Sequence, residues 1–298
     1  MRFYVRMRGG LGNQMFQYAY ALALRERYPE AEIWLDTREY RTYKRRVFEL
    51  ADFVLDRDTF LFSEGKLRYD AAIRVFHVYQ RLYREIRKKQ PYGLSEAMAR
   101  RGILLTGLGC PLPESQLPEE TFLYGYFQNI ELLVPLRAKL QEIYSVPEKV
   151  LAGLPSALRQ VGDNSVAVSI RLGGDMVRSG WQLCSRDYSR EGLARIRREH
   201  RIDRVLIFSD DPERVSAEKW FDDLGLDLTY AAALSPAEQM SVLKQCRHFV
   251  ISNSTFAWWG AFLGAGEDEG VIVAPTFWQG NRSTAEDSLY LKNMILLQ

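Results

Sequence analysis

Apolar and polar residues alternate along the chain in blocks that predict strands and helices. Phe3 to Met7 has the pattern of a short strand, and apolar positions from Met15 to Leu24 recur at helical spacing after a Gly-rich turn. A second strand, Ile33 to Asp36, ends in an acid. A strand, a Gly-rich turn, a helix and a strand in this order are typical of the opening of an α/β unit.

The second half of the chain repeats this alternation more regularly. Near-continuous apolar runs predict buried strands at 166–171, 205–209, 228–231, 249–252 and 271–274, and helices are expected at 192–199, 212–222, 236–245 and from 256. Before them lie an expected aromatic strand at 122–127 and an expected helix at 130–144. Such strands form a parallel sheet covered on both faces. We therefore expect an α/β protein of two Rossmann-like lobes facing a cleft, an acceptor-side lobe over 1–155 and a nucleotide-binding lobe over 156–298, whose last residues can pack back on the first.

Composition narrows the class of protein. The 298 residues are 47% hydrophobic and 26% charged, which excludes a disordered or fibrous chain. The formal net charge of +2 is too small for a general nucleic-acid binder. Between residues 37 and 101, however, 16 Lys and Arg stand against 9 Asp and Glu, so the near-neutral total hides a basic region.

Cysteine usage and hydropathy bear on the cellular compartment. Cys110, Cys184 and Cys246 are widely spaced and form no CxxC pair, so we expect no disulfide framework, no metal site and a reducing cytoplasm. No run reaches the roughly 18 to 20 apolar residues of a bilayer span. The helix expected from Ala72 to Lys89 is basic on one face. This face is either a solvated surface of the acceptor lobe or a peripheral contact with anionic lipid headgroups at the inner face of the membrane.

Four polar segments follow predicted strands, where the loops of a doubly wound sheet bind ligands. They are Gly9–Gln14, Ser169–Asp175, Phe208–Pro212 and Ile251–Gly260. Arg171 ends an apolar strand, where it needs an anionic partner, and its guanidinium suits a bidentate grip on a phosphate. Each segment also has a purely structural interpretation. Gly9–Gln14 can be a tight turn, Arg171 can form an ion pair with Asp175, and the acids and hydroxyls of the other two segments can be ordinary helix caps. Trp258 and Trp259 are expected in the core.

These segments give a set of candidate site residues. The candidate catalytic residues are Arg171 and Asp175, and the candidate substrate- and nucleotide-binding residues are Gly10, Asn13, Gln14, Ser169, Ser209, Asp210, Asp211, Asn253, Ser254, Thr255 and Phe256.

Taken together, the segments resemble glycosyltransferase family 11, the α-1,2-fucosyltransferases. Gly9–Ala19 is similar to the N-terminal signature of that family, and Gly125–Gln128 resembles its middle aromatic motif. Ser169–Asp175 resembles the HxRxGD segment shared by the α-1,2, α-1,6 and protein O-fucosyltransferases, with Ser169 at the histidine position. Phe208–Pro212 and Cys246–Gly260 complete the set.

The resemblance implies a GT-B type fold and a galactoside 2-α-L-fucosyltransferase in bacterial surface-glycan synthesis. The enzyme would transfer L-fucose from GDP-fucose, with inversion and without a cofactor or metal, to a galactose-containing acceptor that can be lipid-linked. Arg171 would hold the diphosphate together with Ser254 and Thr255. The candidates for the general base are Asp175, Asp187 and Glu238, in that order, and the alternative is a departure assisted by the substrate itself with little help from a base. Alternatives are another fucosyl linkage, a catalytically silent nucleotide-sugar binder, or a Rossmann oxidoreductase, which the missing GxGxxG disfavours.

Overall fold

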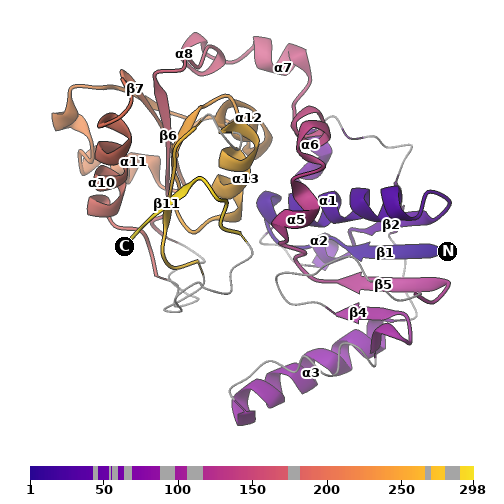
Figure 1. Ribbon diagram of the computed structural model, residues 1–298. Coiled ribbons are helices and arrows are strands. Elements are labelled where there is room, and N and C mark those ends of the chain that lie inside the picture. The colour runs from indigo at the N-terminus through magenta and orange to yellow at the C-terminus, as the bar shows by residue number, and fades with distance from the viewer. Residues whose placement is uncertain are drawn as a thin grey trace. The chain divides into compact units, whose positions relative to one another are not determined.

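The computed structural model describes residues 1–42, 46–53, 55, 60–63, 69–87, 98–105, 117–173, 182–265, 270–278 and 289–298. The chain forms two compact units (Figure 1). The first consists of Met1–Phe48 and Asp56–Leu136, and the second of Glu49–Leu55 and Arg137–Gln298.

The first unit is built on a parallel sheet of strand order β3-β2-β1-β5-β4. Its elements are β1 (Arg2–Arg6), α1 (Leu11–Arg27), β2 (Glu32–Asp36), α2 (Glu39–Thr42), β3 (Leu61–Ser63), α3 (Asp70–Arg87), β4 (Ile103–Leu105), β5 (Glu120–Tyr124) and α5 (Ile130–Leu133). Helix α1 is buried along almost its whole length, which explains why its sequence is apolar on most faces. The ring of Tyr20 on α1 stacks on Phe127, beyond β5, with centroids 4.1 Å apart.

The second unit carries a parallel sheet of order β11-β10-β9-β6-β7-β8. Its elements are η1 (Leu50–Asp52), α6 (Arg137–Ile143), α7 (Glu148–Ala152), α8 (Ser156–Arg159), β6 (Ser165–Ile170), α10 (Arg186–Arg197), β7 (Arg204–Ser209), α11 (Pro212–Ala217), η2 (Asp222–Leu224), β8 (Asp227–Tyr230), α12 (Pro236–Leu243), β9 (His248–Val250), α13 (Thr255–Gly264), β10 (Ile272–Pro275) and β11 (Met294–Leu297). The last strand of the chain thus belongs to the second sheet. Trp258 and Trp259 are fully buried, which confirms that they are core residues.

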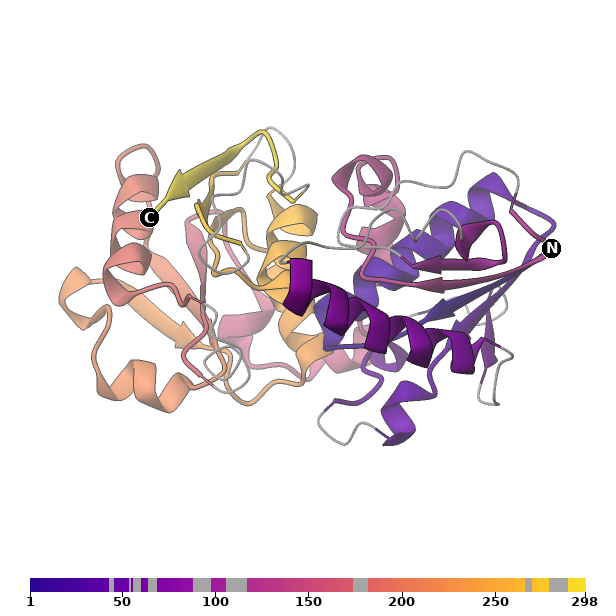
Figure 2. The same cartoon turned by 90° about the horizontal axis from the view of Figure 1, so that it is seen from below.

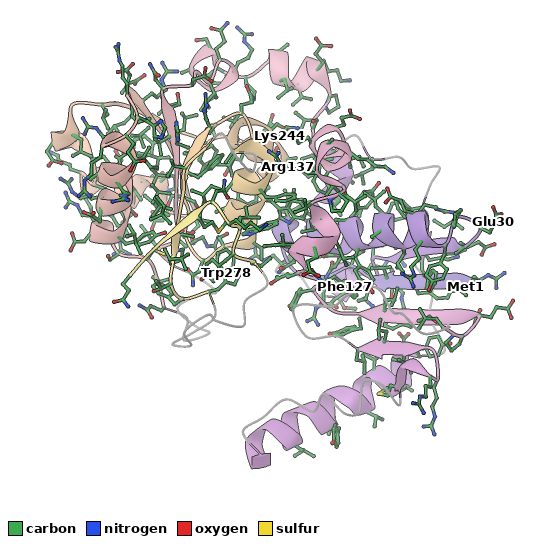
Figure 3. The ribbon with its side chains drawn as sticks, viewed as in Figure 1. Met1, Glu30, Phe127, Arg137, Lys244 and Trp278 are labelled. Atoms are coloured by element: carbon green, nitrogen blue, oxygen red, sulfur yellow. The ribbon has the colours of Figure 1, made fainter. Side chains whose placement is uncertain are left out.

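The helix expected over 130–144 is two helices that belong to different units. Pro135 lies between α5 and α6, where it cannot supply the N–H that a continuous helix needs. Helix α6 is fastened to the second unit, because Arg137 donates hydrogen bonds to the carbonyls of Phe262 and Leu263 at 2.7 and 3.0 Å (Figure 3). Residues 137–155, expected in the first lobe, therefore pack with the second unit.

Lys244, at the end of α12, also holds α6. Its ammonium donates to the Gln141 carbonyl at 2.6 Å and to the Ser145 hydroxyl. Figure 3 shows Lys244 and Arg137 close together at this junction. The short segment around η1 is held in the second unit by Phe53, whose ring lies 5.5 Å from that of Tyr144.

Candidate functional site

The second sheet changes its direction of growth beside β6. The chain adds β7 and β8 on one side of β6 and then returns to add β9 on the other side. Loops that diverge from such a point leave a crevice at the carboxyl ends of the strands, which is where open α/β sheets bind ligands. Three of the four polar segments predicted from the sequence follow β6, β7 and β9, so the fold brings them to one edge.

Arg171 directly follows β6, and a carboxylate from the loop after β7 faces its guanidinium. Arg171 Nε lies 3.6 Å from Asp210 Oδ2, and the two side chains are 25% and 23% exposed. Asp210 Oδ1 accepts a hydrogen bond from the Leu172 N–H at 2.9 Å. Asp210 therefore positions both the guanidinium and the loop that carries it. The alternative partner from the sequence, Asp175, lies outside the described residues.

The two other candidates after β7 are engaged in the turn into α11. Asp211 is the N-cap of this helix, and its Oδ1 accepts from the Arg214 N–H at 3.1 Å. The Ser209 hydroxyl accepts from the Asp211 N–H, also at 3.1 Å. Asp211 thus has the ordinary capping role that the sequence left open, whereas Asp210 points to Arg171.

The segment between β9 and α13 gathers hydroxyls, an amide and a helix N-terminus. The hydroxyls of Ser169 and Ser252 lie 3.1 Å apart and are buried, which ties the ends of β6 and β9 together. Ser254 begins α13 without making a capping hydrogen bond of its side chain to that helix. Ser254, Thr255 and Phe256 are partly exposed at the helix start. Helix N-termini present N–H groups and a partial positive charge, so they favour phosphate.

Asn253 is the most informative residue of this segment. Its side chain is 4% exposed, and its Nδ2 donates to the Gln182 carbonyl at 3.0 Å. Among the described residues its Oδ1 is buried and has no hydrogen-bond partner. A buried acceptor without a donor is costly. The amide therefore predicts a ligand that brings an N–H or O–H group to this position.

The first sheet has an equivalent point between β1 and β5, where the Gly-rich loop begins α1. Gly9 has a φ of +80°, and a Cβ there would come within 2.8 Å of Asn13 Nδ2, so only glycine fits. Asn13 Oδ1 in turn accepts from Gln128 Nε2 at 3.2 Å. Gly10 is the N-cap of α1. The loop is thus folded tightly on its own helix and on the segment after β5.

Two buried glutamine amides on α1 hold this loop. Gln14 is fully buried and donates to the carbonyls of Gly9 and Val47 at 3.0 and 2.9 Å. Gln17, also fully buried, accepts from the Arg8 N–H at 2.9 Å and donates to the Gly125 carbonyl at 3.1 Å. Gln14, predicted as a binding residue, therefore shapes the backbone of the loop, while Asn13 is only half-buried.

A cluster around Arg8 lies at this edge of the first sheet. The guanidinium donates to the Tyr124 hydroxyl and lies over the rings of Tyr124 and Tyr126, 4.8 and 5.4 Å from their centroids. Its Nε is 3.6 Å from Glu39 Oε1 and has no hydrogen-bond partner among the described residues. Burial raises the pKa of Tyr124 to about 12, so this hydroxyl stays protonated at neutral pH. Aromatic faces beside a cation and a carboxylate suit a polar ligand with apolar faces, such as a sugar.

The carboxylate of Asp36, the residue that ends β2, is already paired with arginines. Asp36 is fully buried, 2.7 Å from Arg6 Nε, and accepts from Arg38 Nε at 2.7 Å. Asp70 at the start of α3 completes the network, 2.6 Å from Arg38 and 3.2 Å from Arg6. An acid held by two arginines does not bind the ribose of a dinucleotide, which counts against the oxidoreductase alternative. Among the described residues, no three His, Cys, Asp or Glu side chains come close enough to hold a metal ion.

Comparison with known proteins places these features in a family. Residues 2–298 match the family described as glycosyl transferase family 11. The chain belongs to glycosyltransferase family 11. From Escherichia coli, the O-antigen biosynthesis glycosyltransferase WbnK is 24% identical and the alpha-1,2-colitosyltransferase 25% identical. The alignments cover 92% of this chain in each case, and 94% and 91% of those two proteins.

The comparison of structures agrees in fold. The glycosyltransferase of family 9 from Veillonella parvula DSM 2008 has a TM-score of 0.51 at 11% identity, covering 99% of this chain and 86% of that chain. The two Rossmann-like units thus make up a GT-B type glycosyltransferase, as the sequence predicted.

The sequence did not single out the cluster of Arg8, Glu39, Tyr124 and Tyr126. The one feature of the sequence that pointed to this cluster was the resemblance of Gly125–Gln128, which contains Tyr126, to an aromatic motif of the family. Of the three carboxylates considered as bases, Asp175 lies outside the described residues and Asp187 is exposed in the first turn of α10. Glu238 is taken up in a capping box with Ser235, which occupies its carboxylate.

Proposed function

We propose that this protein is a galactoside 2-α-L-fucosyltransferase, which transfers L-fucose from GDP-fucose to the 2-hydroxyl of a galactose-containing acceptor in bacterial surface-glycan synthesis. The observation that carries the proposal is Arg171, which follows β6 and lies 3.6 Å from Asp210, while the neighbouring strand β9 leads into the N-terminus of α13. A cation and a helix N-terminus at one crevice are suited to a diphosphate. The names of the two relatives, an O-antigen glycosyltransferase and an alpha-1,2-colitosyltransferase, support the pathway class and the linkage.

The reaction needs negative charge to be stabilised on the leaving group. As the bond between the fucose anomeric carbon and the β-phosphate oxygen breaks, positive charge develops on the sugar ring and GDP departs with the bonding electrons. Arg171, the hydroxyls of Ser254 and Thr255 and the N–H groups of α13 are fixed donors for that charge. In this proposal these groups neutralise the diphosphate, and no cofactor is required.

The donor needs more than a phosphate site. The orphan Oδ1 of Asn253 would accept a hydrogen bond from a ribose hydroxyl, a base N–H or a sugar hydroxyl. Phe256, partly exposed at the start of α13, would pack against the nucleotide. Asn253 and Phe256 would thus contact parts of the donor other than its phosphates.

The acceptor is assigned to the Arg8 cluster of the first unit. The rings of Tyr124 and Tyr126 would pack on a galactose face, and Arg8 would donate to a sugar oxygen. Glu39 is the base that the described residues support best, because Asp36 and Asp70 lie 2.7 and 2.6 Å from arginines, whereas the Glu39 carboxylate lies 3.6 Å from Arg8 Nε. The acceptor oxygen would bond to the anomeric carbon on the face opposite the departing GDP, so the configuration inverts as the bond to the β-phosphate oxygen breaks, and the proton of the acceptor would pass to the Glu39 carboxylate.

The test begins with thermal unfolding in the presence of GDP, UDP, CMP or NAD. We expect selective stabilisation by GDP, followed by transfer from GDP-fucose to a β-galactoside and a 1,2 linkage by NMR. GDP-colitose is the competing donor to include, because a relative is named for colitosyl transfer. Protection by GDP without turnover on any galactoside would mean a silent binder. Stabilisation by UDP or NAD instead of GDP would refute the donor.

A further inference from the structure

Helix α3 carries a row of apolar side chains on the outside of the protein. Val75, Val78, Tyr79 and Leu82 are 69, 61, 39 and 56% exposed. Their spacing of three, four and seven residues places them along one side of the helix. Ten large apolar residues are exposed in the described part of the chain, and four of them are these. Single exposed apolar residues are ordinary, but a continuous row marks an interaction surface. We call these four residues the α3 apolar face.

The fold holds α3 at its beginning and does not need the apolar face. Tyr69 and Ile73 are buried in a cluster with Ile103, Leu105 and Phe122. The Asp70 carboxylate joins the arginine network of the sheet, 2.6 Å from Arg38. Figures 1 and 2 show α3 beyond the β4 edge of the first sheet. The core of the first unit therefore accounts for the first turn of the helix, whereas Val75, Val78 and Leu82 stay exposed outside that buried cluster.

The charge of the helix indicates the chemistry of the partner. Arg74, Arg81, Arg84 and Arg87 stand against Asp70 and Glu85 within α3, and Lys88 and Lys89 follow in the sequence. Since Asp70 is already paired with arginines, the other charged residues in the sequence of α3 have a net positive charge. Helices with an apolar face and a polar face rich in arginine lie in the interface of anionic bilayers.

We propose that the α3 apolar face, with the arginines of α3, is a docking surface for an anionic lipid bilayer. A second copy of the chain fits less well, because a contact through the same helix would bring two sets of arginines together. In the described part of the chain no helix is long and apolar enough to cross a membrane. In the proposed contact, the exposed apolar side chains enter the headgroup region, and the positive charge of the helix favours a bilayer that carries anionic phosphates.

The experiment is co-sedimentation of the full chain with vesicles. Phosphatidylcholine vesicles with and without phosphatidylglycerol are compared at low and high salt. We expect binding only to the vesicles that contain phosphatidylglycerol, weakened by salt. The variant R74Q/R81Q/R84Q should lose roughly 100-fold in partitioning, about fivefold for each removed charge. The variant V75Q/V78Q/L82Q should lose at least about tenfold, because the apolar side chains supply the burial.

Val47→Gln is the matched control, because Val47 is 64% exposed in the same unit but lies outside α3. The vesicle binding of this variant should equal that of the wild type. Unchanged thermal unfolding shows that the variants are folded, and Leu82→Gln alone replaces the triple variant if that one unfolds. Three results would each overturn the proposal: no wild-type binding to anionic vesicles at low salt, unchanged binding of both α3 variants, or a wild-type dimer that V75Q/V78Q/L82Q dissociates. Transfer to a soluble galactoside should be the same in all variants, so the proposed function is tested separately.

Discussion

Replacing Arg171 by lysine removes the planar fork of donors and keeps the positive charge. The side chain is 25% exposed, and its Nε lies 3.6 Å from Asp210. A lysine ammonium can approach Asp210, but it cannot present two parallel N–H groups to a diphosphate. The substitution therefore tests donor geometry rather than charge alone.

The size of the effect separates catalysis from folding. Loss of one preorganised donor to a developing negative charge costs about 10² to 10³ in kcat, or roughly 3 to 4 kcal/mol. The Arg171–Asp210 pair is partly exposed, so its contribution to the free energy of unfolding is at most about 1 kcal/mol. In a chain of this size that corresponds to a shift of only about 2 to 4 °C in Tm. Arg171→Lys should thus be folded and nearly inactive.

The assay measures initial rates of transfer from GDP-fucose to a galactoside, together with thermal unfolding in the presence and absence of GDP. The matched control is Arg190→Lys, because Arg190 holds Asp223 with two hydrogen bonds of 2.7 Å and is 28% exposed, similar to Arg171. We expect a small loss of Tm in both variants and a large loss of kcat only in Arg171→Lys. A kcat for Arg171→Lys within about threefold of the wild type would refute the assignment of Arg171 to the diphosphate.

Three further predictions test the remaining groups. Asn253→Ala should weaken GDP-fucose binding by about 5- to 100-fold, measured by isothermal titration, because the donor group of the ligand loses the buried carbonyl that accepts from it; unchanged affinity would show that this oxygen faces no ligand. Glu39→Gln should lower kcat of transfer by about 10² to 10⁴ while hydrolysis of GDP-fucose continues, with the exposed Glu131→Gln as control; a kcat of transfer equal to that of the control would exclude Glu39 as the base. Burial lowers the pKa of Lys244 to about 8, so the unfolded state binds more protons between pH 8 and 10.5 and the free energy of unfolding should rise across that range. Urea titrations should show a smaller rise in Lys244→Met, and an equal rise would contradict this account.

The alternation of strands and helices was predictable because each element is encoded locally. Apolar runs such as Val166 to Ile170 predict buried strands without knowledge of the rest of the fold. The expected order of elements in the second unit is confirmed. Parallel strands bring their carboxyl ends to one edge, so the polar segments after β6, β7 and β9 could be expected together. The fold class and the neighbourhood of Arg171 therefore followed from the sequence.

Short elements and unit boundaries were harder to predict. The strands β3, β4 and β11 have only three or four residues each, too few to establish a periodicity, and their pairing partners are distant in the sequence. The boundary between the units, at Leu136 and Arg137, depends on where α6 packs, and the hydrogen bonds of Arg137 to the end of α13 decide this. Helical spacing alone could not show that residues 130–144 divide there.

The sequence showed which chemical groups were available, and the tertiary structure decided how each group is used. The sequence identified Arg171, the hydroxyls before the double tryptophan and the Gly-rich loop from their local pattern. Only the folded chain pairs Arg171 with Asp210, turns Gln14 onto two carbonyls and leaves Asn253 Oδ1 buried without a donor. Hydrogen bonds and ion pairs join atoms far apart in the chain, so local periodicity cannot assign them.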